Sequence, residues 1–112
     1  MVLQTTQKKL TSPAVRQTLK KFKASLDKER VPFKELILFG SYSKGAAHKD
    51  SDIDVAVILP SQFANKQQTI NRIPWLAKQI EVKLEPHILT RRDLNNPYLA
   101  LISEIKKYGQ KI

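Results

Sequence analysis

Apolar side chains recur along this chain at regular intervals, and the intervals predict where helices and strands form. Between Ser12 and Arg30 the apolar positions return every three or four residues, which is the spacing of one face of an amphipathic helix. These positions are Val15, Leu19, Phe22 and Leu26. Ser12 followed by Pro13 is typical of a helix start, and Pro32 disfavours helix beyond Arg30. We therefore expect a helix that ends near Arg30 and packs behind a sheet.

Two apolar runs follow, Glu35–Phe39 and Ile53–Leu59, and both predict strands. The second run is apolar on both faces after Asp54, which indicates a central strand that is covered on both sides. Aspartate is disfavoured in strands. Its presence at the start of this run favours a functional role for Asp54, since functional sites tend to break local sequence rules.

The second half of the chain predicts two more helices and one more strand. Residues 62–79 read as a helix that Pro74 must bend, break or restart. Its apolar side is Phe63, Ile70, Ile73 and Leu76. Trp75 could lie in the core or face a partner, and the core is expected because buried aromatic side chains dominate core energetics. Residues 80–85 alternate strictly between apolar and charged side chains, which predicts a strand with one covered face.

The last part of the chain predicts a capped turn and a closing helix. Thr90 and Asp93 have the spacing of a capping box, with aspartate in place of glutamate. A helix then opens near Pro97 and ends at Gly109, with Leu99, Ile102 and Ile105 on one face. The pattern as a whole predicts an α+β domain over residues 1–112, with a small mixed sheet and helices packed on one side. Residues 1–11 are expected to be a mobile lead-in.

Composition narrows the class of protein and of partner. The chain has 112 residues, no cysteine and no apolar run near the 18 residues that a membrane span needs. The amino terminus lacks an apolar signal core, so we expect a cytoplasmic protein without membrane contact. Twenty Lys and Arg oppose ten Asp and Glu, a formal net charge of +10. This charge favours an acidic protein partner first and RNA second, because no motif interleaves basic and aromatic residues.

The candidate chemistry lies between the two apolar runs. Gly40 and Ser41 follow the first run, and Asp52 and Asp54 open the second. The two aspartates project from the same side of a strand with Cα atoms about 6.5 to 7 Å apart, so they can share hard divalent cations. Gly40 lets the backbone approach a ligand closely, and a helical turn after Ser41 favours an anion. The alternative is a set of turn glycines and solvated strand-end carboxylates.

This pattern resembles a known family. Gly40-Ser41 followed by Ser51-Asp52-Ile53-Asp54 resembles the Gly-Ser…Asp-x-Asp signature of the DNA polymerase β-like nucleotidyltransferases. The short chain resembles their minimal members (MNT), which often pair as antitoxins with HEPN-domain toxins. The resemblance runs from the first strand to Glu85 and implies the palm-like nucleotidyltransferase fold. It also implies a third acidic ligand on a neighbouring strand, where the family more often has aspartate: Glu85 is the candidate and Glu81 the alternative.

The resemblance also implies an activity. Asp52, Asp54 and Glu85 would act in catalysis as ligands of two Mg²⁺ ions, and ATP would lie against Gly40, Ser41 and Lys44. The protein would transfer AMP from ATP to a hydroxyl, that of a tyrosine, on its HEPN toxin and so act as an antitoxin by AMPylation.

Other readings of the same residues stay open. His48 and Lys49 could also meet phosphates, and His87 could bond Glu85 or a phosphate or be structural. At the level of function, one alternative is a catalytically idle antitoxin that neutralises its toxin by binding. Another is a nucleotidyltransferase acting on RNA ends, suggested by the positive charge.

Overall fold

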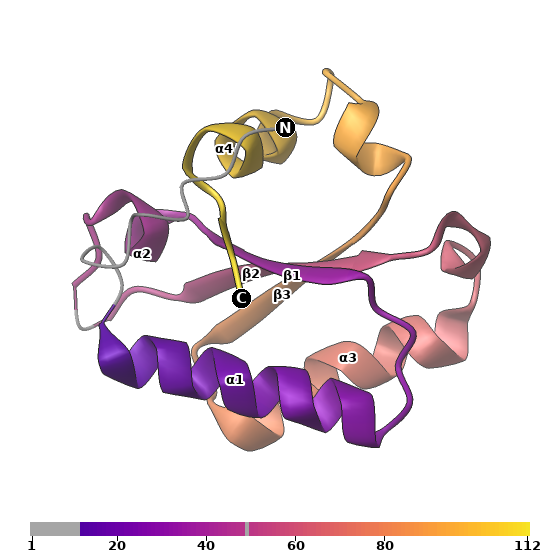
Figure 1. The fold of residues 1–112 in the computed structure, drawn as a ribbon, viewed down its shortest axis with the longest axis horizontal. Helices are drawn as coiled ribbons and strands as arrows, with labels where there is room; N and C mark the ends of the chain where they lie inside the picture. Colours follow the sequence, from indigo (N-terminus) through magenta and orange to yellow (C-terminus); the bar gives the residue numbers. More distant parts are fainter. Residues whose placement is uncertain (1–11, 49) are drawn as a thin grey trace.

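The computed structural model describes residues 12–48 and 50–112, and these form an α+β fold around one mixed sheet (Figure 1). The strands are β1 (Glu35–Phe39), β2 (Ile53–Leu59), β3 (Leu84–Thr90) and β4 (Gln110–Lys111). The helices are α1 (Pro13–Lys28), α2 (Ser41–Lys44), α3 (Gln67–Ile80) and α4 (Ala100–Tyr108), with 3₁₀ turns at Ser61–Phe63 and Asp93–Asn95. The expected lead-in over residues 1–11 and the candidate Lys49 lie outside the described residues.

The sheet has the strand order β3-β2-β1-β4. β1 is antiparallel to both β2 and β4, whereas β2 and β3 are parallel and are joined through α3. The expected mixed α+β sheet is therefore confirmed. β1 and β2 begin and end at the predicted residues, because each apolar run is bounded by polar and turn-forming residues.

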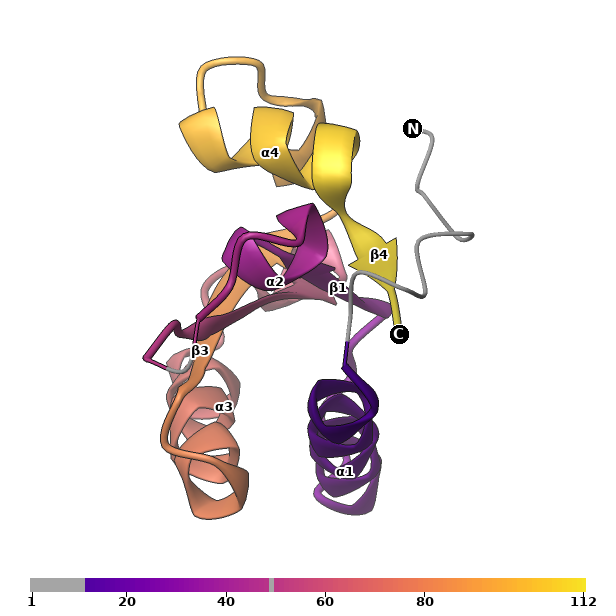
Figure 2. The ribbon, with the colours of Figure 1, turned by 90° about the vertical axis from the view of Figure 1, so that its left-hand side faces the viewer.

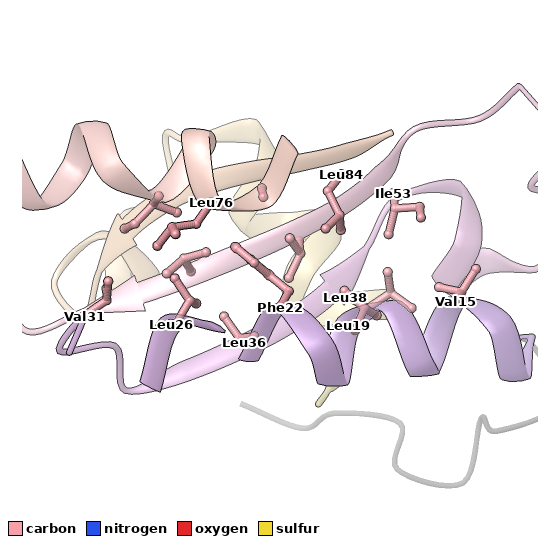
Figure 3. Packing of buried hydrophobic residues seen from close by; sticks show 14 of the residues in the cluster. Val15, Leu19, Phe22, Leu26, Val31, Leu36, Leu38, Ile53, Leu76 and Leu84 are labelled. Carbon is pink, nitrogen blue, oxygen red and sulfur yellow. The ribbon is translucent and has the colours of Figure 1, made fainter. Parts of the chain in front are cut away.

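Helices cover both faces of the sheet. α1 and α3 lie on one face and α4 lies on the other (Figure 2), so the expectation that the helices pack on one side is wrong, because the strands are apolar on both faces. The α1 and α3 face carries the larger core, in which Leu19, Phe22 and Leu26 pack with no exposed surface (Figure 3). On the α4 face, Ile102 and Ile105 pack against Ile37 and other strand residues. The sheet is thus the middle layer of three.

The first helix follows the predicted pattern. The Ser12 hydroxyl accepts a hydrogen bond from the Val15 amide at 3.2 Å, and Pro13 occupies the first helical position. The chain leaves α1 through Arg30, which has a φ of 59°. Its four apolar positions are all buried, so the apolar period identified a core helix correctly.

The predicted strand over residues 80–85 is wrong. Ile80 ends α3, a turn follows, and β3 starts only at Leu84. The alternation misled because it crosses an element boundary: Ile80 and Leu84 both reach the larger core, but Val82 between them is 72% exposed. β3 then continues through Pro86, which an edge strand tolerates because it needs no amide donor on its open side.

Two other expectations about the second half are corrected. α3 begins at Gln67, after the separate 3₁₀ turn, and runs through Pro74 without ending there. Trp75 is 64% exposed and lies outside the core. The buried side of α3 is occupied by Ile73, Leu76 and Ala77. Trp75 lies at a different angle around the helix axis, so its side chain points away from that side.

The carboxyl-terminal region differs in its boundaries. Thr90 and Asp93 exchange the predicted capping hydrogen bonds, with the Thr90 amide 2.8 Å from Asp93 Oδ2. They cap a 3₁₀ turn, however, and α4 starts three residues after Pro97. Gly109 ends α4 as expected, and the unpredicted β4 follows it.

None of the helices in the described part of the chain is long and apolar enough to cross a membrane.

Candidate functional site

A tight corner joins β1 to α2 at Gly40. This residue has a φ of 78°, and a Cβ built on it would overlap with the carboxylate of Asp54. Glycine is required here for both reasons. The buried Ser43 hydroxyl donates a hydrogen bond to the Gly40 carbonyl oxygen at 3.0 Å, which holds the backbone of the corner in place. Ser41 begins α2 directly after the corner.

Strand pairing brings two of the three candidate carboxylates together. Asp54 pairs with Phe39 of β1 on one side and with Glu85 of β3 on the other. Paired residues on neighbouring strands project from the same face, and the strands lie about 4.8 Å apart. Asp52 lies just before β2 and is exposed.

The register favours Glu85 over Glu81 as the third carboxylate. Glu81 lies in the turn before β3, where its Oε2 accepts a hydrogen bond from the Lys83 amide at 3.0 Å. Glu85, in contrast, lies beside Asp54 on the same face of the sheet. The assignment of the ligands themselves stays a prediction.

Two basic side chains contact this carboxylate pair, and sequence reasoning did not assign either contact. His87 Nε2 lies 3.0 Å from Asp54 Oδ1, and the edge of the imidazole packs on Phe39 with ring centroids 5.0 Å apart. Lys78 Nζ lies 3.1 Å from Glu85 Oε1. The strand period could have placed His87 beside Asp54, since it shares the face of Glu85 two residues earlier. The Lys78 contact depends on the α3–β3 turn, which the sequence pattern did not predict.

Lys44, predicted to bind phosphate, contacts α4 in this structure. Its Nζ lies 2.5 Å from Glu104 Oε1 and 5.2 Å from the centre of the Tyr108 ring. The hydrogen bond to Glu104 raises the pKa of the Lys44 ammonium above its ordinary value, against a smaller opposing effect of desolvation. Lys44 thus ties α2 to α4 at the side of the corner.

The loop between α2 and β2 is held by its own hydrogen bonds. The Ser51 hydroxyl accepts from the His48 amide at 3.0 Å, and the Ser51 amide donates to the His48 carbonyl at 2.9 Å. The ring Nδ1 of His48 faces the Asp50 amide at 3.4 Å. These bonds shape the segment that delivers Asp52 and Asp54.

The residues fit a divalent cation that is shared with a ligand. Within residues 12–48 and 50–112, no three His, Cys, Asp or Glu side chains are grouped so that they alone could hold a metal ion. Mg²⁺ does not need such a cage, because it is usually held by one or two carboxylates together with substrate phosphates. Asp54 and Glu85 supply two neighbouring carboxylates, and because Gly40 has no Cβ, the Asp54 carboxylate can lie directly against the backbone of the corner.

Comparisons with known proteins find a matching family model and related sequences. The family model described as a nucleotidyltransferase domain matches residues 18–112. Two proteins of Methanocaldococcus jannaschii, both named as candidate protein adenylyltransferases, are 29% and 27% identical to this chain over 90 and 89 residues. Each alignment covers 80% of this chain and 87% of the relative.

Solved structures show the same fold. A chain from a variant of the MntA–HpeT toxin–antitoxin is similar with a TM-score of 0.56 and 22% identity, over 84% of this chain and 70% of that one. A chain from a toxin–antitoxin crystallised with AMP-PNP gives a TM-score of 0.52 and 23% identity, over 85% and 69%. The palm-like fold that the sequence resemblance implied is thereby confirmed.

Proposed function

The chain belongs to the family of nucleotidyltransferase domains, and on that premise we propose that it transfers AMP from ATP to a hydroxyl of a HEPN-domain toxin, acting as its antitoxin. The proposed acceptor is a tyrosine. The observation that carries the proposal is the packing of Gly40 on Asp54, with Glu85 beside it in register. The names of the Methanocaldococcus relatives support a protein acceptor, and the likeness to toxin–antitoxin chains supports a toxin partner.

In the proposed reaction the acceptor oxygen forms a bond to the α-phosphorus of ATP. The bond from that phosphorus to the bridging oxygen of the β-phosphate breaks, pyrophosphate leaves and the hydroxyl proton is released to water. Two Mg²⁺ ions, when bound by Asp52, Asp54 and Glu85, supply neutralisation of phosphate charge and lower the pKa of the hydroxyl.

The residues of the chain contribute mainly position. The corner at Gly40 admits the triphosphate close to the backbone, and Ser41 offers a hydroxyl and an amide beside it. The strand register sets Asp54 and Glu85 at one edge of that space. Correct placement of two reactants can lower a barrier by about 7 to 11 kcal/mol, which is why nucleotidyl transfer needs little covalent help.

Label transfer from α-³²P-ATP in the presence of Mg²⁺ tests the proposal. Wild type and Asp52→Ala/Asp54→Ala are incubated with and without the protein product of the adjacent gene. We expect label on a tyrosine of that protein with wild type only, identified by mass spectrometry. Asp27→Ala, which removes an exposed carboxylate from α1, is the matched control and should transfer normally. Unlabelled partner in a stable complex with wild type would overturn the transfer reaction.

One observation favours a second candidate function. The absence of a three-ligand metal group within the described residues is compatible with an antitoxin that neutralises its toxin by binding alone. That function predicts that Asp52→Ala/Asp54→Ala protects cells from the toxin as well as wild type does. Adenylyl transfer predicts that the double variant fails to protect while still forming the complex.

A further inference from the structure

The carboxylates of Asp54 and Glu85 lie close enough to repel each other when no metal is bound between them. They are register partners on parallel strands and share one face of the sheet. Like charges on directly paired strand residues are destabilising. Each carboxylate, however, has one basic side chain on one of its two oxygens.

For Asp54 the basic group is His87. Its Nε2 lies 3.0 Å from Oδ1 of Asp54, and the edge-on contact with Phe39 holds the imidazole plane at 66° to the phenyl ring. Because an ionised carboxylate only accepts hydrogen bonds, Nε2 is the donor whenever the carboxylate is ionised. The second oxygen, Oδ2, points toward Gly40 and accepts no hydrogen bond within the described residues.

For Glu85 the basic group is Lys78. Its Nζ donates to the Leu84 carbonyl at 2.5 Å, to the Val82 carbonyl at 2.7 Å and to Glu85 Oε1 at 3.1 Å. An ammonium has three donors, so these three oxygens use all of them. Two of the three are backbone oxygens, that of Val82 in the α3–β3 turn and that of Leu84 at the start of β3, and they fix the ammonium in place. The carboxylate of Glu85 is therefore oriented by a group that is itself anchored, and its Oε2 accepts no hydrogen bond from the described residues.

We propose that His87 and Lys78 are positioning residues that each hold one oxygen of a carboxylate, and so aim Asp54 Oδ2 and Glu85 Oε2 at a divalent cation. The proposal rests on the metal-dependent site of the proposed function. Neither residue touches nucleotide or acceptor in this role. Removing such outer partners of a ligand typically lowers metal affinity about 10- to 100-fold.

Titration with Mn²⁺, followed by electron paramagnetic resonance in the presence of a non-hydrolysable ATP analogue, tests the proposal without any partner protein. His87→Phe keeps the ring against Phe39 but removes the donor. His87→Gln restores an N–H near the place of Nε2. We expect about tenfold weaker Mn²⁺ binding for His87→Phe, and binding within about threefold of wild type for His87→Gln.

Lys78 is tested with Lys78→Met and Lys78→Gln, of which the second keeps an N–H donor. We expect about tenfold weaker Mn²⁺ binding for Lys78→Met and partial recovery for Lys78→Gln. Lys20→Met removes the same charge from an exposed position on α1 and should bind Mn²⁺ like wild type. Thermal unfolding of each variant separates a change in the site from a loss of fold.

The outcomes separate this proposal from the proposed function. Unchanged Mn²⁺ affinity in folded His87→Phe and Lys78→Met would overturn the positioning role, whatever the transfer assay shows. A wild type that binds no Mn²⁺ would overturn it too. If wild type binds Mn²⁺ and the variants bind it more weakly as expected, but wild type transfers no label, only the proposed AMP transfer is overturned. In active protein we expect His87→Phe to lower kcat with little change in the KM for the acceptor.

Discussion

The two faces of the sheet are built from the same strands but have different tasks. On the face covered by α1 and α3, Ile53, Val55 and Val57 of β2 enter an apolar core without interruption. On the other face, Ala56 and Ile58 pack under α4, and the same row of β2 then reaches Asp54. One face of β2 thus contributes to stability, and the other face carries the residue proposed for the chemistry. The contrast teaches that β2 can carry Asp54 on its α4 face because the side chains on its opposite face all lie in an apolar core.

The largest effect should come from breaking the apolar face. Phe22 has no exposed surface and is among the largest side chains buried against α3 and the sheet. Phe22→Ala should lower the free energy of unfolding by about 3 to 5 kcal/mol, through lost burial and the cavity left behind. Urea denaturation measures this loss. The folded fraction should keep the wild-type rate of transfer, and a variant with normal stability but reduced transfer would contradict the division between the faces.

The next largest effect should come from the corner on the other face. Gly40 and Gly45 both have positive φ, 78° and 73°, so alanine strains both positions. Only at Gly40 would the added Cβ meet the carboxylate of Asp54. We expect Gly40→Ala to reduce transfer about 100-fold, which corresponds to roughly 2.7 kcal/mol in the barrier. Gly45→Ala is the matched control: it should lose stability but keep most of its activity, and equal losses in both variants would refute a specific role for the Gly40 contact.

A smaller effect tests whether the core under α4 is separate from the site. Ile102 is 2% exposed and packs in the core on that face. Ile102→Val removes one methylene and should cost about 0.5 to 1.5 kcal/mol of stability. Thermal unfolding gives the shift, and Mn²⁺ titration should show unchanged metal affinity. A change in metal affinity would show that α4 packing reaches the carboxylates.

The smallest effect concerns Lys44. Its pKa is raised because Glu104 hydrogen-bonds the ammonium, so any stabilisation is complete below the ordinary lysine pKa and is lost only as the pH rises through the higher value of the folded state. Near neutral pH it is constant. Glu104→Gln should free Lys44 for phosphate and lower the KM for ATP about two- to threefold, the size of an exposed ion pair. Lys44→Met should raise this KM. Steady-state kinetics measure both effects, and a KM for ATP that does not change in Lys44→Met would contradict phosphate binding by Lys44.

Much of the fold could be predicted from local pattern. α1, β1 and β2 were found because an apolar period or run lies between clear end signals, as with Ser12-Pro13. The strand predicted over 80–85 failed because alternation does not reveal where a helix ends. β4 has two residues and exists only because β1 offers a free edge, so no local signal marks it. Trp75 was misplaced because size predicts burial but helical phase decides it.

The candidate site divides in the same way. Gly40, Ser41, Asp52 and Asp54 are close in sequence, and their spacing carried the prediction. Glu85 was placed from a strand assignment whose bounds were wrong, yet the parallel register sets it beside Asp54. The partners of His87 and Lys78 depend on tertiary contacts, which sequence spacing does not contain.

The register also bears on the order in which the molecule assembles. Gly40 meets Asp54 through an antiparallel pairing of β1 and β2 that spans few residues, whereas Glu85 reaches Asp54 only by the crossover through α3. Short loops close at lower entropic cost than long ones, and non-local pairing slows folding. The Gly40–Asp54 half of the site is therefore formed by the β1–β2 hairpin, and the Asp54–Glu85 half by residues that lie farther apart in the chain. A nascent or refolding chain should hold its glycine corner before it can hold a second carboxylate, so that it becomes competent for metal only once β3 has paired with β2.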